Sequence, residues 1–253
     1  MIDLANPFES SKFCITWAKD HIAELDREID AFLSDKDSHI AFIEPDRDGV
    51  YKLLKFKLCK PIPLAIRGHT SDAVINLRSA LDQALCSCFE MANIQMPTTY
   101  FPITRTKDDF ENTVNGRCKG LPQDISDVVR QFQAYKGGNN ALWALNKLSN
   151  TNKHGILRPV VFAQTLAKAS GTGGGIQIEL RPSWDSTKNE AILGRIPVGI
   201  DFTIDCDYAH FIAFNQIEFI DGEEVVGTLH QFADVVEGVV MALEGESRRI
   251  GLY

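Results

Sequence analysis

The chain has 253 residues, and 34 acidic against 26 basic side chains give it a formal net charge of −8. Its hydrophobic content of 44% and charged content of 24% are close to those of an average soluble globular protein. These values exclude a disordered chain, a collagen-like chain and a disulfide-dense miniprotein. The acidic balance also disfavours extensive binding to duplex DNA, which needs many Lys and Arg contacts with phosphates.

The cysteines and the chain start point to a cytoplasmic protein. Six cysteines are dispersed, and the one close pair, Cys86 and Cys88, is a poor metal clamp because positions i and i+2 of a helix point in different directions. We therefore expect reduced thiols. The first residues lack the pattern of a signal peptide, and no stretch approaches the roughly 18 apolar residues of a membrane span. No membrane partner is expected.

The first half of the chain, residues 1–154, is predicted to be mainly helical with an inserted β-hairpin. Ser10 and Ser11 are N-cap candidates for an amphipathic helix that ends near residue 33. Its predicted apolar face consists of Phe13, Trp17, Ile22, Leu25, Ile29 and Phe32. A two-residue period predicts the hairpin near 39–58.

Four further helices are expected in this half, with a loop over 93–106. They cover approximately residues 64–91, 108–115, 121–135 and 139–153. The apolar stripe of the 64–91 helix is Val74, Leu77, Leu81, Leu85 and Cys88.

The second half, residues 155–253, is predicted to be an antiparallel sheet closed by a terminal helix. The strand candidates are 157–163, 175–180, 191–196, 201–206 and 211–220. The helix covers 225–243, and its apolar stripe must be buried against the sheet or the first helix, which would pack the two halves as one unit. The expected fold class is therefore α+β.

Two segments resemble ligand sites but do not carry the required pattern. The glycine-rich run 170–175 precedes a strand-like segment rather than the helix N-terminus that a phosphate loop needs. Asp205, Asp207 and His210 could offer metal ligands, but acidic residues on a solvated strand face are commoner. We expect neither a metal nor a cofactor.

The helix over 64–91 carries an unusual polar segment, Asn76-Leu-Arg-Ser-Ala-Leu-Asp82. Arg78 lies at the edge of the apolar stripe, and Asp82 lies one turn later, so the two side chains can meet. This arrangement is compatible with a half-buried ion pair that fixes helix packing.

A second polar segment, Asn150-Thr-Asn-Lys-His154, lies at the end of a predicted helix. A helix C-terminus favours a protonated imidazole, so His154 could titrate near neutral pH. Asn152 and His154 could instead cap helix carbonyls. In the functional reading, Arg78 and Lys153 bind a phosphate or another anion, with Asn76, Asn150 and Asn152 beside them. Asp82 has an orienting role in this site, and His154 is the acid/base.

These two segments, together with Tyr100-Phe-Pro-Ile103, resemble a family of uncharacterised bacterial proteins of similar length. The polar helix also resembles HEPN domains, which are helical units of nucleotide-binding proteins and RNases. The HEPN motif is an Arg followed, four to six residues later, by a His. Arg78 would be that Arg, but Gln83 stands near the His position, and glutamine cannot act as an acid/base. A HEPN-like enzyme would therefore need His154.

Two functions of different classes remain open. The first is a noncatalytic binding or assembly protein that self-associates as a homo-oligomer. The second is a HEPN-like nucleotide- or RNA-directed enzyme that uses His154, with Asp82 as a second catalytic residue. The expected ligand is a small anion or single-stranded RNA. The lysines at 52, 55, 57 and 60 also predict a local basic surface on the hairpin.

Overall fold

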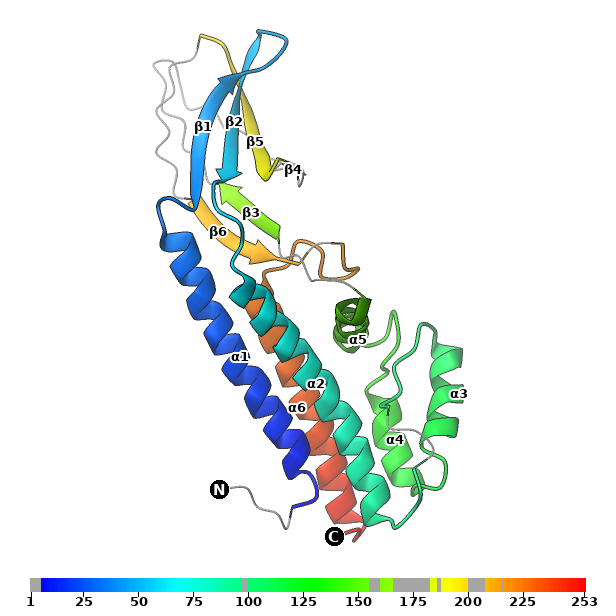
Figure 1. Ribbon diagram of the computed structural model, residues 1–253. Helices are drawn as coiled ribbons and strands as arrows, with labels where there is room; N and C mark the ends of the chain where they lie inside the picture. Colours follow the sequence, from blue (N-terminus) through cyan, green and yellow to red (C-terminus); the bar gives the residue numbers. More distant parts are fainter. Residues whose placement is uncertain are drawn as a thin grey trace.

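Three long helices run side by side along the molecule (Figure 1). They are α1 (Glu9–Ser34), α2 (Leu64–Met91) and α6 (Val225–Arg249). The computed structural model describes residues 6–96, 100–154, 160–165, 183–185, 188–199, 208–214 and 216–253. The predicted stripes of α2 and α6 are buried in full, so these helices contact one another, and α1, through the faces that their 3.6-residue period indicates.

Two antiparallel sheets lie beyond the end of α1 and the start of α2 (Figure 1). The strands are β1 (His39–Pro45), β2 (Tyr51–Leu58), β3 (Val160–Thr165), β4 (Ser183–Asp185), β5 (Glu190–Pro197) and β6 (Tyr208–Ala213). The first sheet has the order β1-β2-β5-β4, and the second pairs β3 with β6. The predicted α+β class is confirmed. Because β2 pairs with β5, one sheet contains strands from both sides of residue 154.

The hairpin of β1 and β2 forms as predicted, but its lysines do not form a free basic surface. Lys55 pairs with Glu44 and lies 3.5 Å from Glu190, which also pairs with Lys57 at 3.2 Å. Lys60 lies 2.6 Å from Asp35 at the end of α1. The expected basic patch is therefore wrong for these three lysines, because acidic residues from neighbouring elements neutralise them.

The start of α1 differs from the prediction in two ways. The helix begins at Glu9, and neither serine caps it; Phe8 occupies the N-cap position and is fully buried. Phe13 and Trp17 are about half exposed, at 50% and 48%, and stack on each other on the solvent side. The buried face of this turn instead consists of Ser11, Cys14, Ile15 and Ala18.

Three shorter helices lie to one side of the long ones: the last two contact α6, and the first packs against the second (Figure 1). They are α3 (Lys107–Arg117), α4 (Gln123–Gln131) and α5 (Asn140–His154). The predicted helix over 121–135 is too long, because Gln133 has a positive φ of 47° and turns the chain. Asn139 accepts a hydrogen bond from the backbone N–H of Leu142 at 3.1 Å and so caps α5.

The C-terminal strands agree with the prediction in part. β3 and β5 overlap the expected strands 157–163 and 191–196. β6 overlaps the expected strand 211–220 only at residues 211–213, because it ends at Ala213 and a tight turn follows, in which Phe219 has a φ of 73°. The expected strands 175–180 and 201–206 lie outside the described residues, as do the run 170–175, Asp205 and Asp207.

The terminal helix α6 is longer than predicted and extends to Arg249. Its length and hydropathy alone would suffice to cross a membrane. However, α6 packs against α1 and α2 through its apolar stripe. This packing buries 44% of the most apolar window of the helix.

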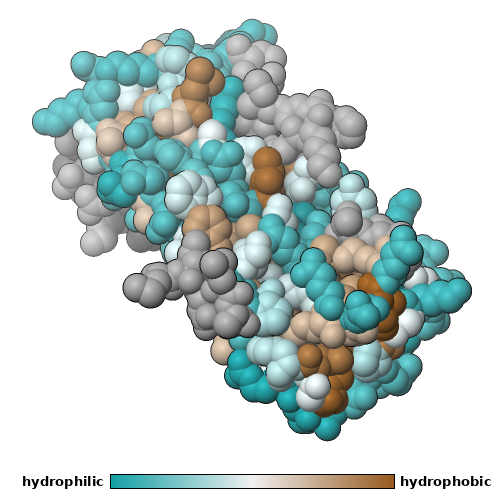
Figure 2. All heavy atoms as spheres, turned by 60° about the horizontal axis from the view of Figure 1, so that its bottom comes forward, coloured by the Kyte–Doolittle hydropathy of each residue, from teal (hydrophilic) through white to brown (hydrophobic). Residues whose placement is uncertain are grey.

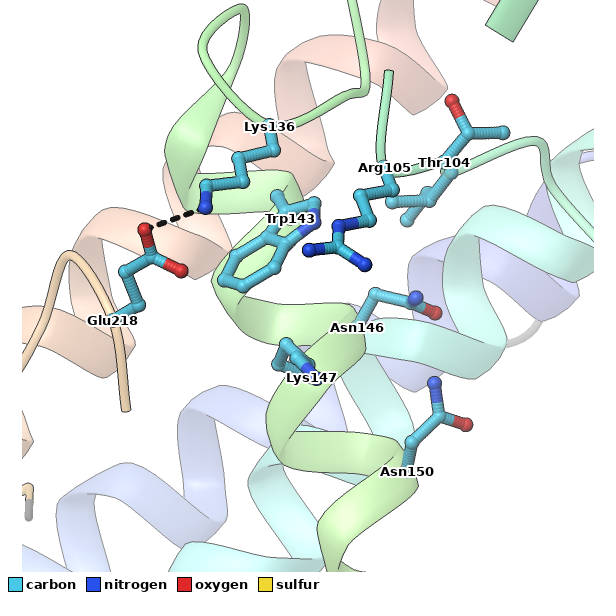
Figure 3. Close-up of a pocket in the computed structure, with 9 residues that line it drawn as sticks. Thr104, Arg105, Lys136, Trp143, Asn146, Lys147, Asn150 and Glu218 are labelled. Atoms are coloured by element: carbon cyan, nitrogen blue, oxygen red, sulfur yellow. Dashed lines mark ion pairs between the residues drawn. The ribbon is translucent and has the colours of Figure 1, made fainter. Parts of the chain in front are cut away.

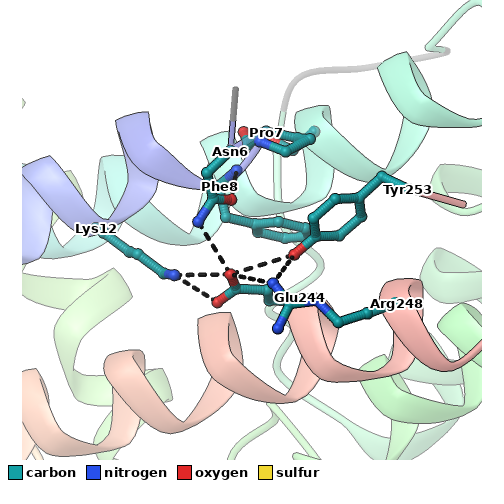
Figure 4. Close-up of polar contacts among 8 residues, drawn as sticks. Asn6, Pro7, Phe8, Lys12, Glu244, Arg248 and Tyr253 are labelled. Atoms are coloured by element: carbon teal, nitrogen blue, oxygen red, sulfur yellow. Dashed lines mark hydrogen bonds and ion pairs between the residues drawn. The ribbon is translucent and has the colours of Figure 1, made fainter. Parts of the chain in front are cut away.

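Glu244 of α6 binds residues from both ends of the described chain (Figure 4). Its carboxylate lies 2.6 Å from Lys12 Nζ and accepts a hydrogen bond from Asn6 Nδ2 at 3.1 Å. Tyr253 Oη donates to the same carboxylate at 3.2 Å, and Arg248 lies 3.4 Å from it. This cluster joins the segment before α1 and the residues after α6 to the same point of the helix bundle.

Candidate functional site

Arg78 and Asp82 form a largely buried ion pair on α2, with 11% and 19% of their side chains exposed. The Arg78 guanidinium also donates from Nε to Asn146 Oδ1 of α5 at 3.2 Å. A third hydrogen bond runs from Nη2 to the backbone oxygen of Phe101 at 3.0 Å. Arg78 thus joins α2, α5 and the loop before α3.

The loop at Phe101 is held from two sides. Its backbone N–H donates to Asp82 Oδ1 at 2.7 Å, and Arg117 of α3 donates to its backbone oxygen at 3.0 Å. The same Arg117 nitrogen contacts the Tyr100 oxygen at 3.1 Å. The Phe101 ring is fully buried. The ion pair therefore binds both backbone groups of Phe101: Asp82 accepts from its N–H, and Arg78 shares its oxygen with Arg117.

The charges of this pair carry a desolvation cost. Burial raises the pKa of Asp82 and lowers the pKa of Arg78, while the attraction between the two opposes both shifts. Ion pairs of this kind add little net stability, but removal of one partner is costly because the other charge is left buried. With its donors engaged by Asp82, Asn146 and Phe101, Arg78 has the contacts of a residue that fixes packing.

Arg78 of the first polar segment bonds to Asn146, which lies on the same helix as the second segment. The sequence analysis did not single out Asn146. Asn146 lies one helical turn before Asn150 on α5, and this i,i+4 spacing was the available signal. His154 is eight residues beyond Asn146, which corresponds to about 12 Å along the helix axis. The side chains of Asn152, Lys153 and His154 lie outside the described part of the structure. Asn76 donates to the Asp72 backbone oxygen at 2.8 Å.

The position that corresponds to the HEPN histidine points away from Arg78. Gln83 accepts a hydrogen bond from Ser10 and donates to Cys14 Sγ at 3.3 Å, so its side chain packs against α1. Arg78 instead contacts α5 and the loop at Phe101. The two positions of the motif therefore contact different elements: Gln83 contacts α1, whereas Arg78 contacts α5 and the loop at Phe101.

A pocket of about 400 Å³ lies beside this junction, between α5, the loop before α3 and the turn before α6 (Figure 3). Its lining residues are Ile103, Thr104, Arg105, Lys136, Trp143, Asn146, Lys147, Asn150 and Glu218. We call it the Trp143 pocket. It contains three cationic side chains and one carboxylate, so its lining is positive in a chain whose total charge is −8.

Trp143 is the centre of the charged part of this pocket (Figure 3). The ammonium groups of Lys136 and Lys147 lie 5.9 and 5.6 Å from its ring centroid, within the range of cation–π attraction. Phe219 meets the ring edge-on at 5.7 Å. Glu218 pairs with Lys136 at 2.8 Å and so neutralises one of the two lysines.

Arg105 reaches the pocket from a fixed stretch of backbone. The preceding residue, Thr104, donates its N–H to the Ala134 oxygen at 3.0 Å and forms an isolated bridge with Tyr135. The guanidinium extends toward Trp143 and Asn146 in Figure 3. Neither Arg105 nor Lys147 has an ion pair within the described residues. Within this part of the chain, two positive charges are therefore available to an anion.

Sequence reasoning missed most of this pocket. Among the predicted site residues whose side chains the structure describes, only Asn150 is in its lining, while Arg105, Lys136 and Lys147 come from separate segments without a recognisable motif. The described residues contain no cluster of three or more His, Cys, Asp or Glu side chains that could hold a metal ion. His210 belongs to β6, but its side chain is not among those described.

Comparisons of the chain with protein-family models, with curated proteins and with solved structures find no match. The resemblances to a bacterial family and to HEPN domains therefore stay predictions.

Proposed function

We propose that this chain is a noncatalytic binding protein that takes a small anionic ligand in the Trp143 pocket. The observation that supports this proposal is the convergence of Arg105, Lys136 and Lys147 on one cavity that contains a single carboxylate. Arg78, the anion ligand expected from the sequence, is engaged by α5 and by the Phe101 loop. The proposed anion site is therefore the neighbouring pocket around Trp143, which shares Asn146 with the Arg78 contacts.

The lining matches a ligand that carries phosphate or carboxylate groups. A guanidinium binds such groups through two parallel hydrogen bonds, and an ammonium adds a point charge. Asn146 and Asn150 supply amide groups beside Arg105 (Figure 3). A volume of about 400 Å³ is within the range of small-molecule sites. The positive lining contrasts with the acidic charge of the whole chain, so anion binding depends on this local cluster.

Titration with inorganic pyrophosphate tests the proposal. We expect the wild type to bind pyrophosphate in isothermal titration calorimetry at low salt. Arg105→Ala and Lys147→Ala should each weaken the affinity by about tenfold, the effect of about 1.4 kcal/mol per lost charged contact. Lys36→Ala, which removes an exposed lysine in the turn between α1 and β1, is the matched control and should change nothing.

Two results would contradict the proposal. One is the absence of pyrophosphate binding by the folded wild type at millimolar concentration. The other is an equal affinity of the wild type, Arg105→Ala and Lys147→Ala, which would mean that any binding occurs elsewhere on the chain.

The alternative, a HEPN-like RNA-directed enzyme, depends on His154 as the acid/base. Gln83 faces α1 rather than Arg78, and Asp82 is engaged by Arg78 and Phe101. These contacts favour the binding function.

The five cysteines within the described residues have free thiols, as expected of the cytoplasmic location that we propose.

Self-association is the second part of the proposal, and Phe13 and Trp17 are the residues that support it. Their ring centroids are 5.8 Å apart, and the rings stack on the exposed side of α1. On the face drawn in Figure 2, hydrophobic residues form separate patches among hydrophilic ones. We expect Trp17→Glu to shift the mass in light scattering toward the monomer. A monomeric wild type at micromolar concentration would refute self-association.

A further inference from the structure

Two histidines face each other across the α1–α2 contact. His21 of α1 and His69 of α2 are both half-buried, and their Nδ1 atoms are 3.1 Å apart. The ring centroids are separated by 5.4 Å, and the Trp17 ring meets the His21 ring edge-on at 5.7 Å. Neither histidine belongs to the Trp143 pocket.

The nitrogen separation suits a shared metal ion as well as a hydrogen bond. A hydrogen bond requires one ring to donate and the other, neutral ring to accept. If one metal ion bound both nitrogens at about 2.0–2.1 Å, their 3.1 Å separation would give an N–metal–N angle of roughly 98°. That angle lies between those of octahedral and tetrahedral coordination, so the separation of the two nitrogens is compatible with one shared metal ion.

We propose that His21 and His69 bind one divalent transition metal ion, such as Zn²⁺ or Ni²⁺, through their Nδ1 atoms. Neutral imidazole nitrogens favour these ions over hard cations such as Mg²⁺. The described residues supply no cluster of three or more ligands. The remaining coordination positions are therefore taken by water or by a further ligand. The metal links α1 to α2 at the solvent edge of their contact.

Calorimetric titration of tag-free protein with Zn²⁺ tests this site. The background variant is Cys59→Ser, because Cys59 is an exposed free thiol that could bind zinc by itself. We expect one Zn²⁺ per chain at about pH 7.5. Mg²⁺ should not bind at this site.

His21→Ala and His69→Ala should each weaken Zn²⁺ binding by about tenfold or more, since loss of even an outer-shell partner commonly costs that much. His230→Ala removes an exposed histidine of α6 and is the matched control, with the affinity of the background. Bound Ni²⁺ should quench the fluorescence of Trp17 in the background and not in His69→Ala.

The proposal is overturned if the folded background variant does not bind Zn²⁺ at millimolar concentration. It is also overturned if His21→Ala and His69→Ala bind Zn²⁺ as tightly as His230→Ala does. Pyrophosphate binding at the Trp143 pocket does not enter either result, so the two sites are tested independently.

Discussion

The substitution Asp82→Asn is expected to lower the free energy of unfolding by about 3 kcal/mol or more. It leaves the Arg78 guanidinium, with 11% of its side chain exposed, without a counter-charge inside the protein. Asparagine can still accept the hydrogen bond from the Phe101 backbone, so the loss reports mainly on the charge. Urea denaturation at neutral pH, followed by far-ultraviolet circular dichroism, measures the change.

Asp127→Asn is the matched control, because Asp127 also pairs with an arginine within one helical turn but is 54% exposed. We expect a loss of about 0.5 kcal/mol or less, as for other surface pairs. The double variant Arg78→Met/Asp82→Leu should be less unstable than the sum of its single variants, since it leaves no charge unpaired. Equal, small effects of Asp82→Asn and Asp127→Asn would refute the structural role assigned to the pair.

Glu244→Gln is expected to cost about 2 kcal/mol at neutral pH, because charge-assisted hydrogen bonds are lost. The carboxylate interacts with Lys12, Asn6 and Tyr253, and 11% of its side chain is exposed. Burial alone would raise the pKa of Glu244, but hydrogen bonds from Lys12 and Asn6 and the Lys12 charge lower it below the usual value.

The sign of that pKa shift fixes the pH dependence. A carboxylate with a depressed folded-state pKa contributes stability above the unfolded pKa of about 4.3, and the contribution is lost as the pH falls through the folded value. The difference in stability between the wild type and Glu244→Gln should therefore shrink as the pH falls below about 4.3. Glu237→Gln, on the same helix, is the control, because Glu237 is 43% exposed and pairs with Lys19. A pH-independent difference between the wild type and Glu244→Gln would contradict the assignment.

Helices with one continuous apolar stripe could be predicted from the sequence. The stripes of α2 and α6 are buried residue by residue, because the 3.6-residue period alone places them on one side. The first turns of α1 could not be predicted in the same way. Phe13 and Trp17 are larger and more apolar than Ser11 and Ala18, yet the latter face the bundle, where closely packed helices leave room for small side chains.

The candidate site shows the same division between local and non-local information. The i,i+4 spacing of Arg78 and Asp82 predicts their contact, and the ion pair forms. Their other partners, Asn146 and the Phe101 backbone, are distant along the chain and follow only from the packing of α5 and the loop. The three cations of the Trp143 pocket likewise have no shared period or motif, so only the fold brings them together.

The indole N–H signals of the three tryptophans provide the most direct test of anion binding at the Trp143 pocket. We would record them by two-dimensional ¹H–¹⁵N NMR during a pyrophosphate titration, with Trp143→Phe to identify the pocket signal. The account predicts a saturable shift of the Trp143 signal and no shift of the Trp17 signal, since Trp17 lies on the exposed side of α1. A Trp143 signal that stays unchanged up to millimolar pyrophosphate would contradict it.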